Sequence, residues 1–125
     1  MSLDPVSVRM LSQHLCSPKF RTPEEVVSHF GAMQAQEYRM MRWAVSMRTV
    51  RPSEKAFRQA YDEGRIIRLH LHRGTWQLVT MNDYWWMLRL CGPRSEAAIR
   101  GWMHSNRIDI PKDELMNIRE LLVAE

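Results

Sequence analysis

The sequence predicts an α+β fold that is mostly helical and carries one β-hairpin. Apolar residues recur at helical spacing up to about residue 62, and capping residues precede several of these stretches. The period then changes to two between residues 65 and 72. Apolar and basic side chains alternate there, in the order Ile67, Arg68, Leu69, His70, Leu71 and His72. Helices followed by a hairpin are the order of a winged helix-turn-helix, which is the fold class we expect.

Four helices are expected before the hairpin. The strongest start signal is at Thr22, where Glu25 completes a capping box and Pro23 occupies the first turn. Another helix opens at Pro52 and ends at Gly64, which suits a left-handed C-terminal position. The others cover about residues 5–16 and 37–48. Their predicted buried faces are Val6, Met10, Leu11 and Leu15, and Met40, Met41, Ala44 and Val45.

The hairpin is predicted over about residues 65–80, with a turn at Arg73 and Gly74. A helix follows from Thr80 and stops at Gly92 and Pro93; because it is apolar nearly all round, it should be deeply packed, its tryptophans included. Further helices are expected over about 94–105 and around Leu115, Ile118, Leu121 and Leu122. We therefore divide the chain into a winged-helix domain over 1–92 and a helical connection over 93–125 that begins a second, incomplete unit.

The positive charge is concentrated in one region. Residues 38–107 hold 13 Lys and Arg against 5 Asp and Glu, a balance of +8, whereas the rest holds 5 against 9. Of the 18 basic residues 15 are Arg, whose guanidinium suits bidentate contact with phosphate. Double-stranded DNA is the expected partner, and a solvated arginine-rich face is the competing interpretation. No stretch resembles a membrane span or signal peptide, so a cytoplasmic protein without a membrane partner is expected.

The hairpin and the third helix supply the candidate DNA-binding residues. The basic strip of the hairpin consists of Arg65, Arg68, His70, His72 and Arg73, and the competing interpretation is that its arginines pair with nearby acids. Arg39 and Arg42 on the third helix are further candidates. His70 and His72 stand on one strand face at a spacing that suits a metal, but no third ligand is visible in the sequence, so neither a metal nor a cofactor is expected.

Two carboxamides form the candidate catalytic pair. Gln34 and Gln36 flank Ala35 at a junction between helices, where irregular backbone can direct both side chains to one point. Glutamine does not titrate, but it can hold a water by donating and accepting hydrogen bonds together. The alternative is a contact that stabilises the loop or a helix end.

Four stretches together resemble one family. They are Gly31 to Tyr38, Gly64 to Arg68, Arg73 to Trp76 and Asp83 to Trp86. The chain resembles, over roughly residues 8–94, the bacterial winged-helix DNA-binding-domain family that includes the azinomycin-resistance-type DNA glycosylases, which unhook alkylated bases and interstrand crosslinks. Many members of that family carry His where this chain has Gln77.

The resemblance implies three tandem winged-helix units around a basic DNA channel, of which this chain would be the first unit and the start of the second. It implies a monofunctional glycosylase in which Gln34 and Gln36 position a water against C1′ of the damaged nucleotide. Arg68 and Arg73 would hold the DNA backbone, with Thr75 in the same Arg-Gly-Thr wing. A non-catalytic winged-helix regulator or interaction module is the alternative function. A third is a helical domain whose basic face meets another protein.

Overall fold

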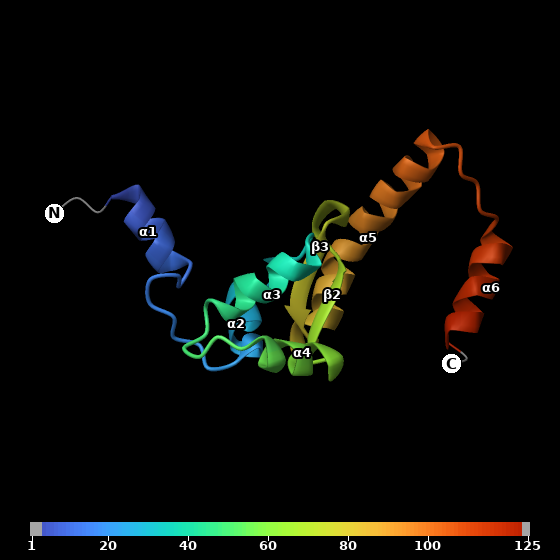
Figure 1. Cartoon of the computed structure of the whole chain (residues 1–125). Coiled ribbons are helices and arrows are strands. Elements are labelled where there is room, and N and C mark those ends of the chain that lie inside the picture. Colours follow the sequence, from blue (N-terminus) through green and yellow to red (C-terminus); the bar gives the residue numbers. More distant parts are fainter. Residues whose placement is uncertain (1–3, 124–125) are drawn as a thin grey trace.

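The computed structural model describes residues 4–123, and Figure 1 shows their arrangement. The elements are α1 (Pro5–Ser12), α2 (Pro23–Phe30), β1 (Met33–Gln34), α3 (Tyr38–Ser46), α4 (Glu54–Asp62), β2 (Ile66–His70), the 3-10 turn η1 (His72–Gly74), β3 (Trp76–Thr80), α5 (Met81–Ser105) and α6 (Lys112–Val123). The protein is thus mostly helical with one small antiparallel sheet, which confirms the predicted α+β class.

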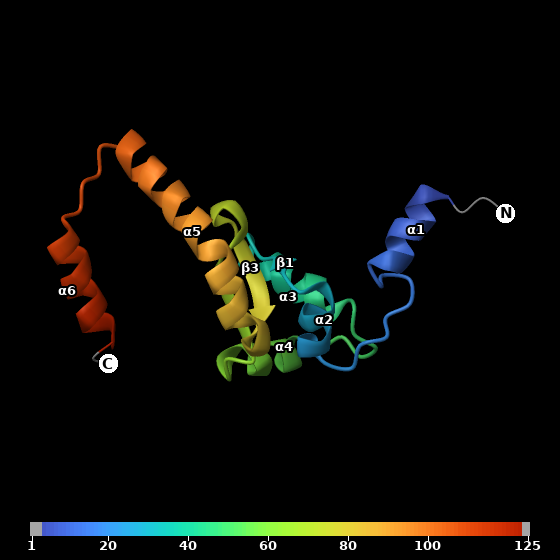
Figure 2. The same ribbon diagram turned by 180° about the vertical axis from the view of Figure 1, so that it is seen from behind.

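The sheet lies between two helical layers. Its three strands run in the order β1-β3-β2, and both pairings are antiparallel. On one face α2, α3 and α4 close the larger core, which includes Phe57, Met41, Ile66 and Leu78. On the other face the first half of α5 covers a smaller cluster around Val79 (Figure 2). Because both faces are covered, no whole face of the hairpin is open to solvent. The sequence predicted that one face would be open, and that prediction is wrong.

Local capping chemistry sets the helix starts. The hydroxyl of Thr22 accepts from the Glu25 amide at 3.2 Å, and that of Ser53 accepts from the Ala56 amide at 3.1 Å. Gly64 ends the turn after α4 with φ +71°, a conformation that favours glycine. These boundaries were predicted because each depends on residues only three or four positions apart.

Helix α5 differs from the prediction in length and in packing. It continues through Gly92 and Pro93 as one helix of 25 residues. Proline removes one helical hydrogen bond and also clashes with the Cβ of the preceding residue; Gly92 has no Cβ, so that second clash is reduced where the helix passes Pro93. Trp85, Trp86 and Leu90 are exposed, and only Met87 of the helix is buried. The prediction of a deeply packed helix is therefore wrong.

The first and last helices are also more exposed than expected. In both views α1 and α6 extend away from the layers that enclose the sheet (Figures 1 and 2). Val6, Met10 and Leu11 of the predicted α1 stripe are exposed, as are Leu115, Ile118 and Leu121 of α6. In α3, Met41 and Val45 are buried as predicted, but Met40 is exposed. A stripe predicts a helix correctly without showing what covers it. Leu122 lies outside the described side chains.

The segment after α1 is attached to the end of α3 by Arg48. This guanidinium is 9% exposed and donates to the main-chain oxygen of Gln13 at 2.9 Å and to its side chain at 3.1 Å. Burial lowers the pKa of Arg48. Burial also lowers the pKa of His14, and the charges of Lys19, His29 and Arg48 act in the same direction. Arg48 therefore has a structural role.

Within residues 4–123 no helix combines the length and apolar character that a membrane crossing requires.

Replacing Phe57 by alanine tests where the core lies. Its side chain is 0% exposed, whereas that of Leu90 is 70% exposed. We expect Phe57→Ala to lower the free energy of unfolding by about 3–5 kcal/mol because it leaves a cavity. Leu90→Ala should change it by less than about 0.5 kcal/mol. Denaturant unfolding followed by circular dichroism measures both, and a large loss for Leu90→Ala would show that α5 is packed after all.

Candidate functional site: the edge strand and its two carboxamides

The candidate catalytic pair lies on and beside β1, the edge strand of the sheet. Gln34 is paired in register with Gln77 of β3. Exposure alternates along the motif: the side chains of Gln34 and Gln36 are exposed, and Ala35 between them is 1% exposed within the larger core. Gln34 belongs to the strand and Gln36 to the bend that follows it, and the two flank a residue that is anchored in the core. The structure thus leaves both of them accessible.

The backbone of this motif is fixed by hydrogen bonds. The Ala35 amide donates to the Trp76 carbonyl at 2.8 Å. The guanidinium of Arg68 donates through Nε to the Ala35 carbonyl at 2.9 Å and through Nη2 to the Gln36 carbonyl at 3.3 Å. Bonds to a charged donor are stronger than neutral ones. Arg68 therefore links β2 to the carbonyls that lie between and after the two glutamines.

Trp76 supports the same guanidinium. The Arg68 guanidinium carbon lies 4.1 Å from the centre of the Trp76 ring, and the centres of the His70 and Trp76 rings are 3.8 Å apart. Such cation–π contact and stacking hold a flat guanidinium in one orientation. The sequence predicted Arg68 on a basic outer strip of the hairpin. That prediction is wrong, because Arg68 shares a sheet face with Leu78 of the larger core, against which Trp76 is packed and partly buried.

On the side of the carboxamides, Gln77 and Thr75 form a short polar chain. Gln77 donates through Nε2 to the Thr75 hydroxyl at 2.9 Å, and that hydroxyl donates to the His72 carbonyl at 2.8 Å. Gln77 is 8% exposed, and as the partner of Gln34 it stands on the same face of the sheet. Sequence reasoning noted Gln77 only as a departure from relatives. Its place beside Gln34 depends on a strand pairing that no local pattern shows.

Comparison with known proteins places this geometry in a family. The family model described as "DNA glycosylase AlkZ-like" matches residues 27–125. The chain belongs to the AlkZ-like DNA glycosylase family. Among solved structures it is similar to the Streptomyces sahachiroi DNA glycosylase AlkZ, with a TM-score of 0.50 and 23% identity over 58% of this chain and 19% of that one. No protein of curated description matches it. The chain thus spans about a fifth of the solved relative.

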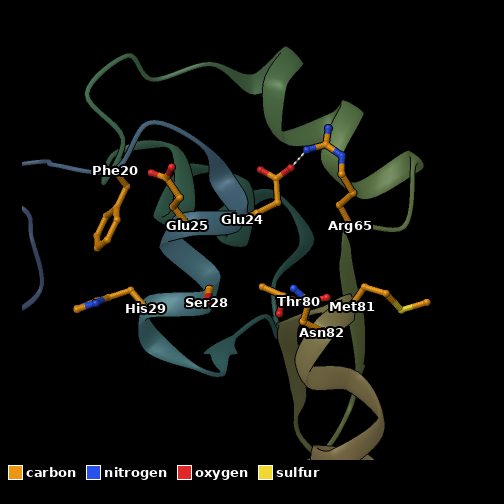
Figure 3. Close-up of a pocket in the computed structure, with 9 residues that line it drawn as sticks. All are labelled: Phe20, Glu24, Glu25, Ser28, His29, Arg65, Thr80, Met81 and Asn82. Atoms are coloured by element: carbon orange, nitrogen blue, oxygen red, sulfur yellow. Dashed lines mark ion pairs between the residues drawn. The ribbon is translucent and has the colours of Figure 1, made fainter.

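The other basic residues predicted for the site are dispersed in this AlkZ-like chain. Arg65 forms an ion pair with Glu24 (Figure 3) and another, at 2.8 Å, with Glu63. His70 lies 2.6 Å, through Nδ1, from the Gly74 carbonyl, and His72 belongs to η1, with Nδ1 3.8 Å from the Cys91 sulfur. The two histidines therefore do not share a strand face, and the predicted basic strip is interrupted. The side chain of Arg73 lies outside the described residues.

The arginines of α3 lie next to the motif. Arg39 is exposed, and Arg42 forms an ion pair with Glu54 while its guanidinium carbon lies 5.0 Å from the Tyr38 ring. Of the predicted site residues, the structure thus brings Gln34, Gln36, Arg68, His70 and Thr75 into one region of the sheet edge. Arg39 and Arg42 follow it along α3, Arg65 lies elsewhere, and the His72 ring lies toward Cys91 although its carbonyl accepts from Thr75.

A larger hollow lies away from this edge, beside α2. Its volume is about 580 Å³, and Glu24, Glu25 and His29 line it together with Arg65 (Figure 3). Arg65 is the only Arg or Lys in its lining, and it is already paired with acids. An acidic hollow of this kind disfavours phosphate. In the part of the chain that the structure describes, no three His, Cys, Asp or Glu side chains gather as they would around a metal.

Replacing Arg68 by glutamine tests whether it fixes the motif. We expect the Ala35 amide to exchange its hydrogen at least tenfold faster in Arg68→Gln, because the neighbouring carbonyls lose their charged donor and β1 opens more often. Arg65→Gln is the matched control on the same hairpin, since Arg65 contacts only acids. Amide exchange followed by NMR measures both. Unchanged exchange in Arg68→Gln would show that β1 is held without it.

Proposed function

We propose that this chain is a winged-helix unit that binds double-stranded DNA in a DNA glycosylase, with Gln34 and Gln36 as its catalytic pair. Membership of the AlkZ-like family supports DNA as the partner. The element order α2-β1-α3-α4-β2-β3 and the sheet order β1-β3-β2 suit a winged helix, in which a third short strand pairs with the hairpin. The division at residue 92 and further units in a longer protein belong to the same proposal.

One observation carries the catalytic part of the proposal. The motif's backbone is fixed by Arg68 and Trp76 while both carboxamides remain exposed. A positioned pair of neutral groups that accept and donate hydrogen bonds can orient a water, and orientation alone contributes strongly to rate. The site would act on a nucleotide turned out of the duplex, since its base and C1′ are otherwise inaccessible.

The chemistry suits groups that do not titrate. A guanine alkylated on N7 is cationic, so its C1′–N9 bond breaks with the electron pair going to the base, which leaves neutral. Water oxygen then bonds to C1′ and its proton passes to solvent. Gln34 and Gln36 hold the water by accepting from its O–H groups and need take no proton. Arg68 fixes the motif rather than the DNA backbone, and in this proposal His70 and Thr75 support the same edge.

A sequence-reading regulator is the alternative, and the composition of α4 speaks against it. In a winged helix the second helix of the helix-turn-helix usually reads the major groove. Here that helix is α4, which holds two acids, Glu54 and Asp62, against Lys55 and Arg58. A helix without net charge is poorly suited to approach phosphates. The edge strand is therefore the better candidate for the centre of the DNA contact.

Base release tests the catalytic pair. The intact protein should release N7-methylguanine from a duplex that carries it, and Gln34→Ala with Gln36→Ala should lower the rate by about 10²-fold because the water is no longer oriented. Gln59→Ala on α4 is the matched control and should keep the full rate. Chromatography of the released base gives the measurement. Undiminished release by the double variant would exclude the pair, and DNA binding without any release would favour the non-catalytic alternative.

Salt dependence tests the DNA contact. Arg65 and Arg68 are occupied within the protein, so we expect few phosphate contacts and a slope of log affinity against log salt smaller in size than about 4. Arg39→Gln should reduce that slope by about 1, because Arg39 is exposed. Arg65→Gln is the control and should leave it nearly unchanged. Anisotropy of a labelled duplex provides the affinities, and a lack of binding at low salt would contradict both DNA functions.

A further inference from the structure

A second hollow lies along one face of α3, beginning next to the glutamine motif. Its volume is about 260 Å³, and its lining from α3 consists of Arg39, Arg42, Trp43 and Ser46. These residues are spaced i, i+3, i+4 and i+7, which places them on one helix face. Arg39 follows Gln36 by three positions. The hollow therefore continues from the motif toward the start of α4, which closes it with Pro52, Ser53 and Glu54.

Two polar atoms of this lining are buried without a partner. Among the residues that the structure describes, neither Nε of Arg42 nor the hydroxyl of Ser46 makes a hydrogen bond. Buried donors of this kind are nearly always satisfied in folded proteins, so a water or a ligand oxygen is expected beside them, and a ligand reaches them once Arg42 moves. A guanidinium N–H beside a hydroxyl is the donor set that suits a phosphate oxygen.

The charge balance of the hollow also suits an anion. The carboxylate of Glu54 is shared, since it pairs with Arg42 and, at 3.0 Å, with Arg58. A phosphate that draws Arg42 away leaves Glu54 paired with Arg58, so no acid loses its only partner. Arg39 at the open side adds a further positive charge that is exposed.

Trp43 supplies a stacking surface beside these donors. Its side chain is 59% exposed, although indoles usually bury most of their surface. The hollow is smaller than the roughly 300 Å³ at which sites for drug-sized ligands begin. It accommodates a phosphate with part of its sugar, and the base has to lie outside, where the indole face is available. Aromatic platforms beside a basic groove are typical of sites for unpaired strands.

We propose that this hollow, the α3 groove, binds one phosphodiester of an unpaired nucleic-acid strand, with the adjoining base stacked on Trp43. The inference rests on the proposed function in taking nucleic acid as the ligand. It adds that the strand leaving the glutamine motif is single-stranded and follows α3. Arg42 and Ser46 bind the phosphate, Arg39 attracts it, and Trp43 keeps the neighbouring base out of the duplex.

Binding of a short labelled oligothymidylate tests the groove. Trp43→Ala should weaken binding about tenfold, as expected for one stacked base, and should leave binding of an abasic oligomer of equal length unchanged. Ser46→Ala should weaken both severalfold without lowering the melting temperature, because its hydroxyl has no partner within the protein. A structural role for Ser46 would lower the melting temperature instead and overturn its assignment.

Matched controls separate the groove from general effects. Trp102→Ala removes an indole on α5 that is 61% exposed, and Arg94→Gln removes an exposed arginine there; neither should change the affinity. Equal losses in Trp43→Ala and Trp102→Ala overturn the proposal. So does binding of thymidine monophosphate as tight as that of the oligomer, because a free nucleotide would then be the ligand.

The two proposals fail separately. Gln34→Ala with Gln36→Ala should leave oligothymidylate binding intact, since neither glutamine lines the groove. If the protein releases no base but Trp43 still governs oligothymidylate affinity, the catalytic proposal fails and the groove stands. If base release depends on the glutamines while Trp43→Ala and Ser46→Ala bind the oligomer as tightly as the wild type, the groove is excluded.

Discussion

The attachment of β1 to β3 is the constraint on which the candidate site depends. A strand of two residues has too few hydrogen bonds to persist alone. It is held because the Ala35 amide finds the Trp76 carbonyl, and because the Arg68 guanidinium satisfies two carbonyls beside the core. Without those bonds the chain between α2 and α3 would be an ordinary loop, and Gln34 and Gln36 would have no common orientation.

The two faces of the sheet carry different side chains at this edge. Arg68 and Trp76 stand on the face of the larger core and hold the motif from within, whereas Gln34 and Gln77 stand on the opposite face. Helix α5 packs on that opposite face over β2, β3 and η1. Since β1 lies at the sheet edge, α5 can close the smaller core without covering the glutamines. The accessibility of the pair is thus a consequence of strand order.

The sequence was sufficient for features that depend on near neighbours. The cap at Thr22, the helix start near Pro52, and the hairpin with its turn are set within a few residues, and each was predicted. Features that depend on distant segments were missed. Alternation suggested that Arg68 faces solvent, because the pattern cannot show that β1 supplies carbonyls for its guanidinium. Likewise an apolar α5 predicted deep packing, although the described residues provide cover only near Met87.

The internal use of arginine changes what the regional charge means for the proposed reaction. Arg65 and Arg68 bond to groups of the protein, and Arg42 has to leave Glu54 before it can bind a phosphate, so the +8 of residues 38–107 overstates the charge that is free for DNA. An Arg68 guanidinium pointing at the glutamines would repel an alkylated base, which is itself cationic, and the positive sugar that forms as it departs. Holding Arg68 on the opposite face, against two carbonyls and an indole, gives the motif rigidity without adding that charge to the side of Gln34. A neutral pair of carboxamides, on an edge strand fixed by Arg68 from the other face of the sheet, is therefore consistent with the proposed release of a positively charged base.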